Sequence, residues 1–98
     1  MKTWVVTRHK GALDWLIEEG VAFDEHIEHL DLDFLHGGDV IIGNLPIPMV
    51  ADINAKGIHY WHLAFTVPFD LRGVELSATQ LRELGISLKA YHVVALEE

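Results

Sequence analysis

Short apolar runs alternate along this chain with segments of helical periodicity that end at glycine, and this alternation limits the folds it can adopt. Residues 3–7 (TWVVT) are β-branched or aromatic and lack polar alternation, as in a strand buried on both faces of a parallel sheet. Residues 11–19 carry an apolar stripe, and Gly20 is suited to stop a helix there. The opening therefore predicts a strand, a short turn and a helix.

The same unit recurs further along the chain. The other expected strands are a weaker one within 23–30 and those over 40–43, 58–67 and 86–96; the other expected helices are 45–57 and 77–84, with a loop over 69–76. Strands that alternate with helices favour an α/β fold with helices on both faces of the sheet. We therefore predict one compact three-layer domain over residues 1–98, with a mainly parallel sheet.

Composition narrows the class of partner. Fifteen acidic against seven basic residues give a formal charge of −8, which argues against a broad surface that tracks the phosphates of duplex DNA. It leaves room for one small positive pocket. Cysteine is absent, so disulfides and thiolate metal sites are excluded. The apolar runs are far shorter than the roughly 20 residues of a membrane span, so we expect no membrane contact and a cytoplasmic location.

Positive charge gathers in the turn after the first expected strand. Thr7, Arg8, His9 and Lys10 lie there, beside the free N–H groups of the helix that starts at Gly11. Those N–H groups and the helix dipole favour an anion. The guanidinium supplies a planar fork for phosphate, the ammonium a mobile charge, and the imidazole a group that exchanges protons near neutral pH. The turn is built like a phosphate site.

A solvated basic turn is the alternative interpretation, with Arg8 paired to Asp14 or Glu18 at the surface. A second turn, GNLP at 43–46, follows the expected strand 40–43 and combines a glycine with amide donors. In α/β sheets, ligands bind beyond the carboxyl ends of the strands, where both turns would lie.

Three segments together resemble a small CRISPR-associated family found beside type III interference loci. They are WVVTRHKGA at 4–12, GDVIIGNLP at 38–46 and RGVELSATQL at 72–81. The resemblance implies a Rossmann-like homodimer related to domains that sense cyclic oligoadenylates. It also implies a ring nuclease, a phosphodiesterase that needs no metal or other cofactor and linearises cyclic oligoadenylate, most often the tetra-adenylate.

For such an activity we assign Arg8 to charge stabilisation and His9 to acid or base work. The implied substrate-binding positions are Thr7, Lys10, Gly11, Gly43, Asn44, Leu45 and Arg72. A two-fold dimer could present the same turn to opposite phosphates of a symmetric ring. The ribose 2′-OH would attack in line and leave 2′,3′-cyclic phosphate ends.

Two other functions stay open at this point: a non-catalytic binding protein for the same ligand, and a small adaptor that docks on another protein. Metal binding is disfavoured, because the pairs His26/His29 and His59/His62 have a spacing that sends strand side chains to opposite faces. The tryptophans lie inside apolar runs, which predicts core packing rather than base stacking.

Overall fold

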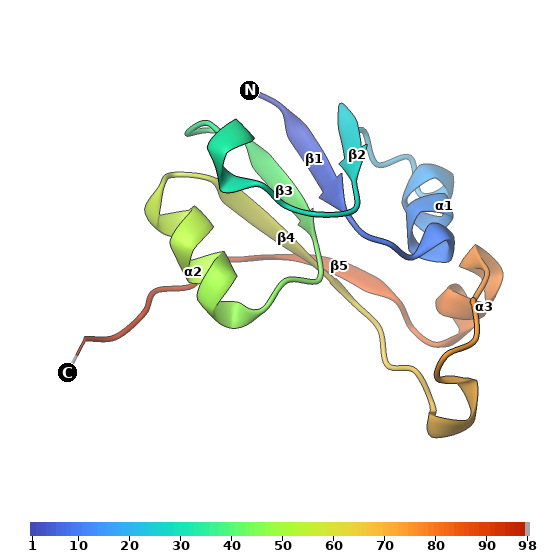
Figure 1. Cartoon of the computed structure of the whole chain (residues 1–98). Helices are drawn as coiled ribbons and strands as arrows, with labels where there is room; N and C mark the ends of the chain where they lie inside the picture. Colours follow the sequence, from blue (N-terminus) through green and yellow to red (C-terminus); the bar gives the residue numbers. More distant parts are fainter. Residues whose placement is uncertain (98) are drawn as a thin grey trace.

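The computed structural model describes residues 1–97, and within them one five-stranded sheet is surrounded by three helices (Figure 1). The strands are β1 (Thr3–Val6), β2 (Glu25–Ile27), β3 (Val40–Gly43), β4 (His59–Ala64) and β5 (Ser87–Tyr91). The helices are α1 (Lys10–Glu18), α2 (Ile47–Ala55) and α3 (Ala78–Glu83). The sheet has the order β2-β1-β3-β4-β5, with β5 alone antiparallel to its neighbour. The expected mixed α/β fold with a mainly parallel sheet is confirmed.

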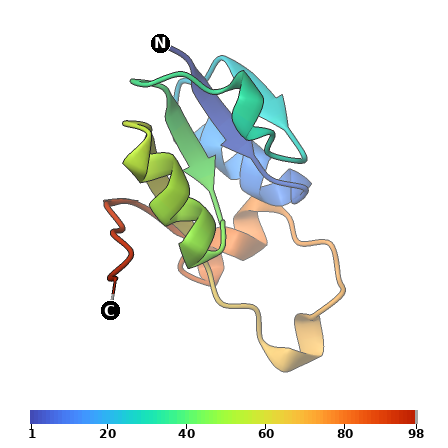
Figure 2. The same cartoon turned by 60° about the vertical axis from the view of Figure 1, so that its left-hand side comes forward.

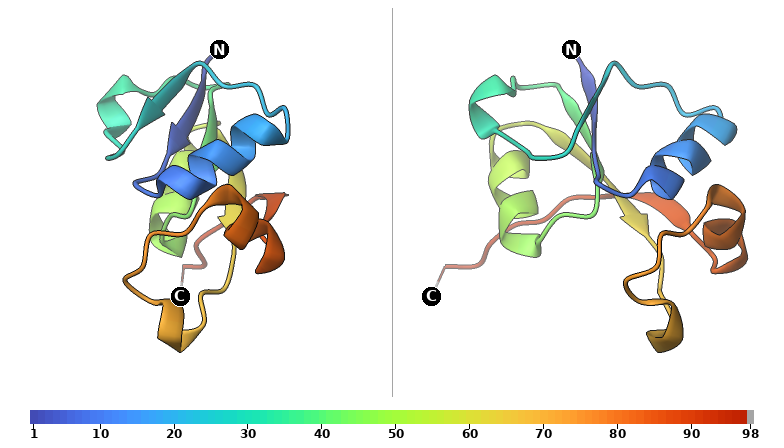
Figure 3. Two further views of the ribbon diagram at one scale, coloured as in Figure 1. Left: turned by 90° about the vertical axis from the view of Figure 1, so that its right-hand side faces the viewer. Right: turned by 45° about the vertical axis from the view of Figure 1, so that its right-hand side comes forward.

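Consecutive residues of β1 face opposite sides of the sheet, as the pleat requires. Val5 is buried in a core cluster with α1 and α3, whereas Val6 is buried in a second cluster with α2. The views along the sheet show α2 on one face and the other two helices on the opposite face (Figure 3). The absence of polar alternation in TWVVT thus reflects a strand covered on both sides.

Several elements are shorter than the sequence predicts. Strand β2 covers three residues of the expected 23–30, and these pair with β1 from Trp4 opposite Glu25 to Val6 opposite Ile27. Strand β4 leaves the sheet at Phe65, before Pro68. The following segment projects away from the body and contains a short 3-10 turn over Phe69–Leu71 (Figure 2).

The amino end of the sheet is held together by one buried carboxylate. Asp39 is 4% exposed and accepts hydrogen bonds from the backbone N–H of Lys2 (3.0 Å), the backbone N–H of His36 (3.0 Å) and Nε1 of Trp4 (3.2 Å). These donors, the Lys2 N–H foremost, hold the pKa of Asp39 below its ordinary value of 3.8, although burial opposes the shift. The carboxylate joins the start of β1 to the approach to β3.

The tryptophans divide between core and surface. Trp15 is buried between the helices and the sheet, as predicted, but Trp61 on β4 is 40% exposed. The core prediction is wrong for Trp61, which lines an open depression of the surface with Val21, Ala22 and Leu88. None of the helices in residues 1–97 has the length and apolar character needed to cross a membrane.

Candidate functional site

A cavity of about 450 Å³ opens at the carboxyl ends of the parallel strands. We call it the carboxyl-end cavity; it is lined by Val6, Thr7, Arg8, His9, Glu28, Asn44, Leu45, Leu63 and Phe65. Strands β1 and β3 end together here, with Val6 opposite Gly43. The strand order reverses between these two strands, and ligands of doubly wound sheets bind at that point. The fold therefore brings the two predicted turns into one site.

The turn between β1 and α1 is shaped by its own side chains. The hydroxyl of Thr7 accepts a hydrogen bond from the backbone N–H of His9 at 3.0 Å. His9 is the N-cap of α1, and its carbonyl accepts from Ala12 and Leu13. No side chain in the described part of the chain caps this helix, and its first turn holds no acidic residue. The positive end of the helix dipole is thus left for an anion.

The imidazole of His9 stands between the turn and the wall of the cavity. It contacts the ring of Phe65 edge-on, with centroids 5.6 Å apart. Its Nδ1 is buried and has no hydrogen-bond partner within residues 1–97. A buried imidazole nitrogen without a partner costs free energy, which is a feature seen at functional sites. The residue lies at the boundary between the β1–α1 turn and the cavity, which it lines.

Arg8 is exposed and contacts a histidine rather than an acid. Its Nη2 lies 2.9 Å from Nε2 and 3.1 Å from Nδ1 of His29, which follows β2. A guanidinium has only donors, so the imidazole accepts. Within residues 1–97 Arg8 forms no ion pair with Asp14 or Glu18, and Glu18 pairs with Arg82 at 3.4 Å. The positive charge of Arg8 is not neutralised by a carboxylate in the described structure.

Strand β2 and the segment that follows it add three residues that the sequence did not place in the site. Glu28 lines the cavity, Nε2 of His26 lies 2.8 Å from the carbonyl oxygen of Thr7, and His29 contacts Arg8. Phe65 is a fourth addition, from the end of β4. The first three residues could have been predicted only from the pairing of β2 with β1, and the sequence alone does not specify that pairing.

The turn after β3 lies directly against the neighbouring strands. A Cβ added at Gly43 would come within 2.8 Å of the carbonyl oxygen of Val6, so glycine is required for this close approach. The side-chain amide of Asn44 donates to the carbonyl of Leu63 at 2.9 Å. The backbone N–H of Leu45 donates to the hydroxyl of Tyr60 at 3.0 Å. Two of the donors predicted to bind substrate are therefore already engaged with β4.

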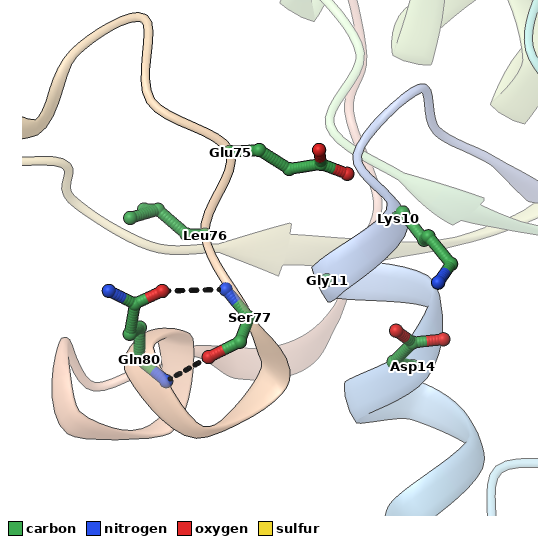
Figure 4. A pocket seen from close by; sticks show the side chains of 7 residues that line it. All are labelled: Lys10, Gly11, Asp14, Glu75, Leu76, Ser77 and Gln80. Carbon is green, nitrogen blue, oxygen red and sulfur yellow. Dashed lines mark hydrogen bonds between the residues drawn. The ribbon is translucent and has the colours of Figure 1, made fainter.

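Lys10 and Gly11 line a second depression, between the start of α1 and the start of α3 (Figure 4). We call it the helix cleft; its other lining residues are Asp14, Glu75, Leu76, Ser77 and Gln80. A Cβ on Gly11 would lie 1.9 Å from the carbonyl oxygen of Leu76. Gly11 thus lets the segment before α3 pack on α1. Ser77 is the N-cap of α3 and forms a capping box with Gln80.

Arg72 is exposed in the projecting segment after the 3-10 turn and is not among the residues that line the carboxyl-end cavity. Of the nine predicted site residues, the cavity brings together Thr7, Arg8, His9, Asn44 and Leu45, with Gly43 packed behind them. Among residues 1–97, no three His, Asp or Glu side chains gather in a way that could hold a metal ion.

Comparison with known proteins gives one family. The family model described as "Putative CRISPR-associated protein (Cas_VVA1548)" matches residues 4–94. No curated protein and no solved structure matches the chain.

Proposed function

Because the chain belongs to the Cas_VVA1548 family of CRISPR-associated proteins, we propose that it is a ring nuclease that binds and linearises a cyclic oligoadenylate messenger of type III CRISPR defence. The single observation that carries the proposal is that Arg8 and His9 line the same cavity. In the described structure the guanidinium of Arg8 contacts His29 and forms no ion pair with a carboxylate. The motif resemblance supports the choice of ligand.

The lining of the cavity suits a nucleotide. Arg8 and the uncapped start of α1 offer positive charge to a phosphate. An adenine base would meet apolar surface from Leu45, Leu63 and Phe65. An aromatic ring such as that of Phe65 can stack on any nucleic-acid base. A cyclic tetra-adenylate is a compact anion, so it can bind one basic turn on a body that is acidic overall.

The reaction needs no group beyond the ligand and the chain. The ribose 2′-oxygen attacks the adjacent phosphorus, the bond from phosphorus to the 5′-oxygen breaks, and the 2′-OH proton leaves to a base. The leaving 5′-oxygen takes up a proton. We assign this acid or base work to His9 and the stabilisation of the charge on the phosphorane oxygens to Arg8. The products are linear fragments with 2′,3′-cyclic phosphate ends.

We also propose that the active species is a homodimer with a Rossmann-like fold. A two-fold axis would place two copies of Arg8 and His9 against opposite phosphates of one ring. In that arrangement Lys10 and Arg72, both exposed, would border the ligand from outside the carboxyl-end cavity, whereas Gly11 is buried and would act by fixing the start of α1.

The test is incubation of the purified protein with cyclic tetra-adenylate in EDTA, followed by mass spectrometry of the ligand. Linear adenylates with cyclic phosphate ends support the enzyme. Intact ring recovered in complex with the protein would indicate a non-catalytic binding protein. Intact ring that does not bind at all would leave the adaptor function as the better account.

A further inference from the structure

The hydroxyl of Tyr60 has three polar neighbours immediately behind the carboxyl-end cavity. Tyr60 lies on β4 and is 3% exposed. Its oxygen is 3.0 Å from the backbone nitrogen of Leu45, 2.9 Å from the carbonyl oxygen of Gly43 and 2.6 Å from Nδ1 of His62. Two of these neighbours belong to the turn after β3, so one side chain holds both ends of that turn.

The proton count gives each partner a role. A phenol has one proton to donate, and the Gly43 carbonyl can only accept, whereas the Leu45 N–H can only donate. All three contacts are satisfied when Tyr60 donates to Gly43 and accepts from both Leu45 and Nδ1–H of His62. Burial raises the pKa of Tyr60 above its ordinary value of 10.0, so the phenol keeps the proton it donates.

This network limits how the turn can meet a ligand. The N–H of Leu45 is directed to Tyr60 and is not free for a phosphate. Asn44 gives one amide proton to the carbonyl of Leu63 and retains a second proton and its carbonyl oxygen. Asn44 is exposed and lines the cavity. The polar contact that the turn can offer a ligand is therefore the side chain of Asn44, beside the apolar side chain of Leu45.

We propose that Tyr60 and His62 are positioning residues, which hold the turn of residues 43–45 in the conformation that presents Asn44 to the ligand. The inference rests on the proposed function for the identity of the ligand, but its geometry is independent of that function. Neither side chain is required to touch the substrate.

The test compares Tyr60→Phe with the wild-type protein. Loss of the hydroxyl removes the acceptor for Leu45, so amide hydrogen exchange at Leu45 should quicken by roughly fivefold or more. The KM or Kd for cyclic tetra-adenylate should rise by a similar factor, while kcat changes by less than about twofold. The control is Tyr91→Phe: Tyr91 contacts the His62 ring edge-on but does not touch the turn, and both readouts should stay at wild-type values.

A wild-type measurement keeps the inference testable if Tyr60→Phe does not fold. The nitrogen chemical shifts of the His62 imidazole should report a proton on Nδ1. An unprotonated Nδ1, an unchanged exchange rate at Leu45 in the folded variant, or a faster exchange rate with unchanged ligand affinity would each overturn the inference. A wild-type protein that binds the ring without cleaving it would count against the proposed function alone, because exchange and affinity still decide the role of Tyr60.

Discussion

The two ends of β1 use their polar groups in opposite ways. At the amino end, the carboxylate of Asp39 is buried and receives three hydrogen bonds from the chain itself. At the carboxyl end, Nδ1 of His9 is buried without a partner in residues 1–97, and the start of α1 has no side-chain cap there. The buried carboxylate at one end is satisfied by the chain, whereas the buried imidazole nitrogen at the other end is not.

The difference also explains where the cation goes. At the amino end Lys2 pairs with Glu25 at 3.7 Å, whereas Arg8 at the carboxyl end contacts the ring nitrogens of His29. Unsatisfied groups and unpaired charge cost stability, and proteins concentrate such groups at sites that bind or react. We therefore expect substitutions at the carboxyl end to change activity, and substitutions at the amino end to change stability.

The largest effect should come from the carboxyl end. His9→Ala should lower kcat for cleavage of cyclic tetra-adenylate by roughly 10²–10⁴-fold, the range for loss of a general acid or base. Arg8→Ala should lower it by roughly 10²–10³-fold through lost charge stabilisation. Single-turnover assays and urea denaturation of each variant check this. Loss of activity accompanied by an equal loss of stability would contradict a catalytic role.

Gly11→Ala should produce the next largest effect, on stability. The new Cβ would lie 1.9 Å from the Leu76 carbonyl oxygen, which is backbone and cannot move aside alone. We expect the free energy of unfolding to fall by about 3 kcal/mol, at the upper end for overpacking. Gly37→Ala is the control, since its nearest contact would be 3.4 Å away and its effect should stay within about 0.5 kcal/mol. Equal effects of the two variants would contradict the close packing of α1 on the Leu76 segment.

Asp39→Asn should weaken the amino end in a pH-dependent way. The pKa of Asp39 is lowered in the folded protein, so its carboxylate stabilises the fold above the ordinary value of 3.8. That contribution is lost as pH falls through the lower folded pKa. The wild type should exceed the variant by about 2 kcal/mol at neutral pH, and the gap should narrow in acid. Urea denaturation of both proteins from neutral to acid pH measures this difference in the free energy of unfolding. A difference that grows in acid would contradict the lowered pKa of Asp39.

Lys10→Ala should have the smallest effect. Lys10 is exposed in the helix cleft, where Asp14 and Glu75 also lie. Its charge acts on the ligand through solvent, so we expect a loss of affinity of roughly threefold at low salt that disappears at high salt. Binding titrations at two ionic strengths check this prediction. A loss as large as that of Arg8→Ala would place a phosphate in the helix cleft instead.

Much of the fold follows from local pattern. Each expected strand and helix is present within the residues described, because apolar runs, caps and glycine stops are local signals. The order of strands is not local. The sequence does not specify that β2 pairs with β1, so it did not predict that Glu28 lines the cavity or that His29 contacts Arg8. The roles of Gly11 and Tyr60 were missed for the same reason, since Leu76 and Leu45 are distant in sequence.

The central claim is that the carboxyl-end cavity holds the ligand while the amino end of β1 does not. Titration of cyclic tetra-adenylate into the His9→Ala variant, followed by amide chemical shifts, tests it directly because the ring should stay intact. We predict the largest shifts at residues 7–9, 28–29 and 44–45, with Lys2, Trp4 and Asp39 unchanged. Shifts centred on the amino end or on the helix cleft, or no shifts at all, would contradict the account.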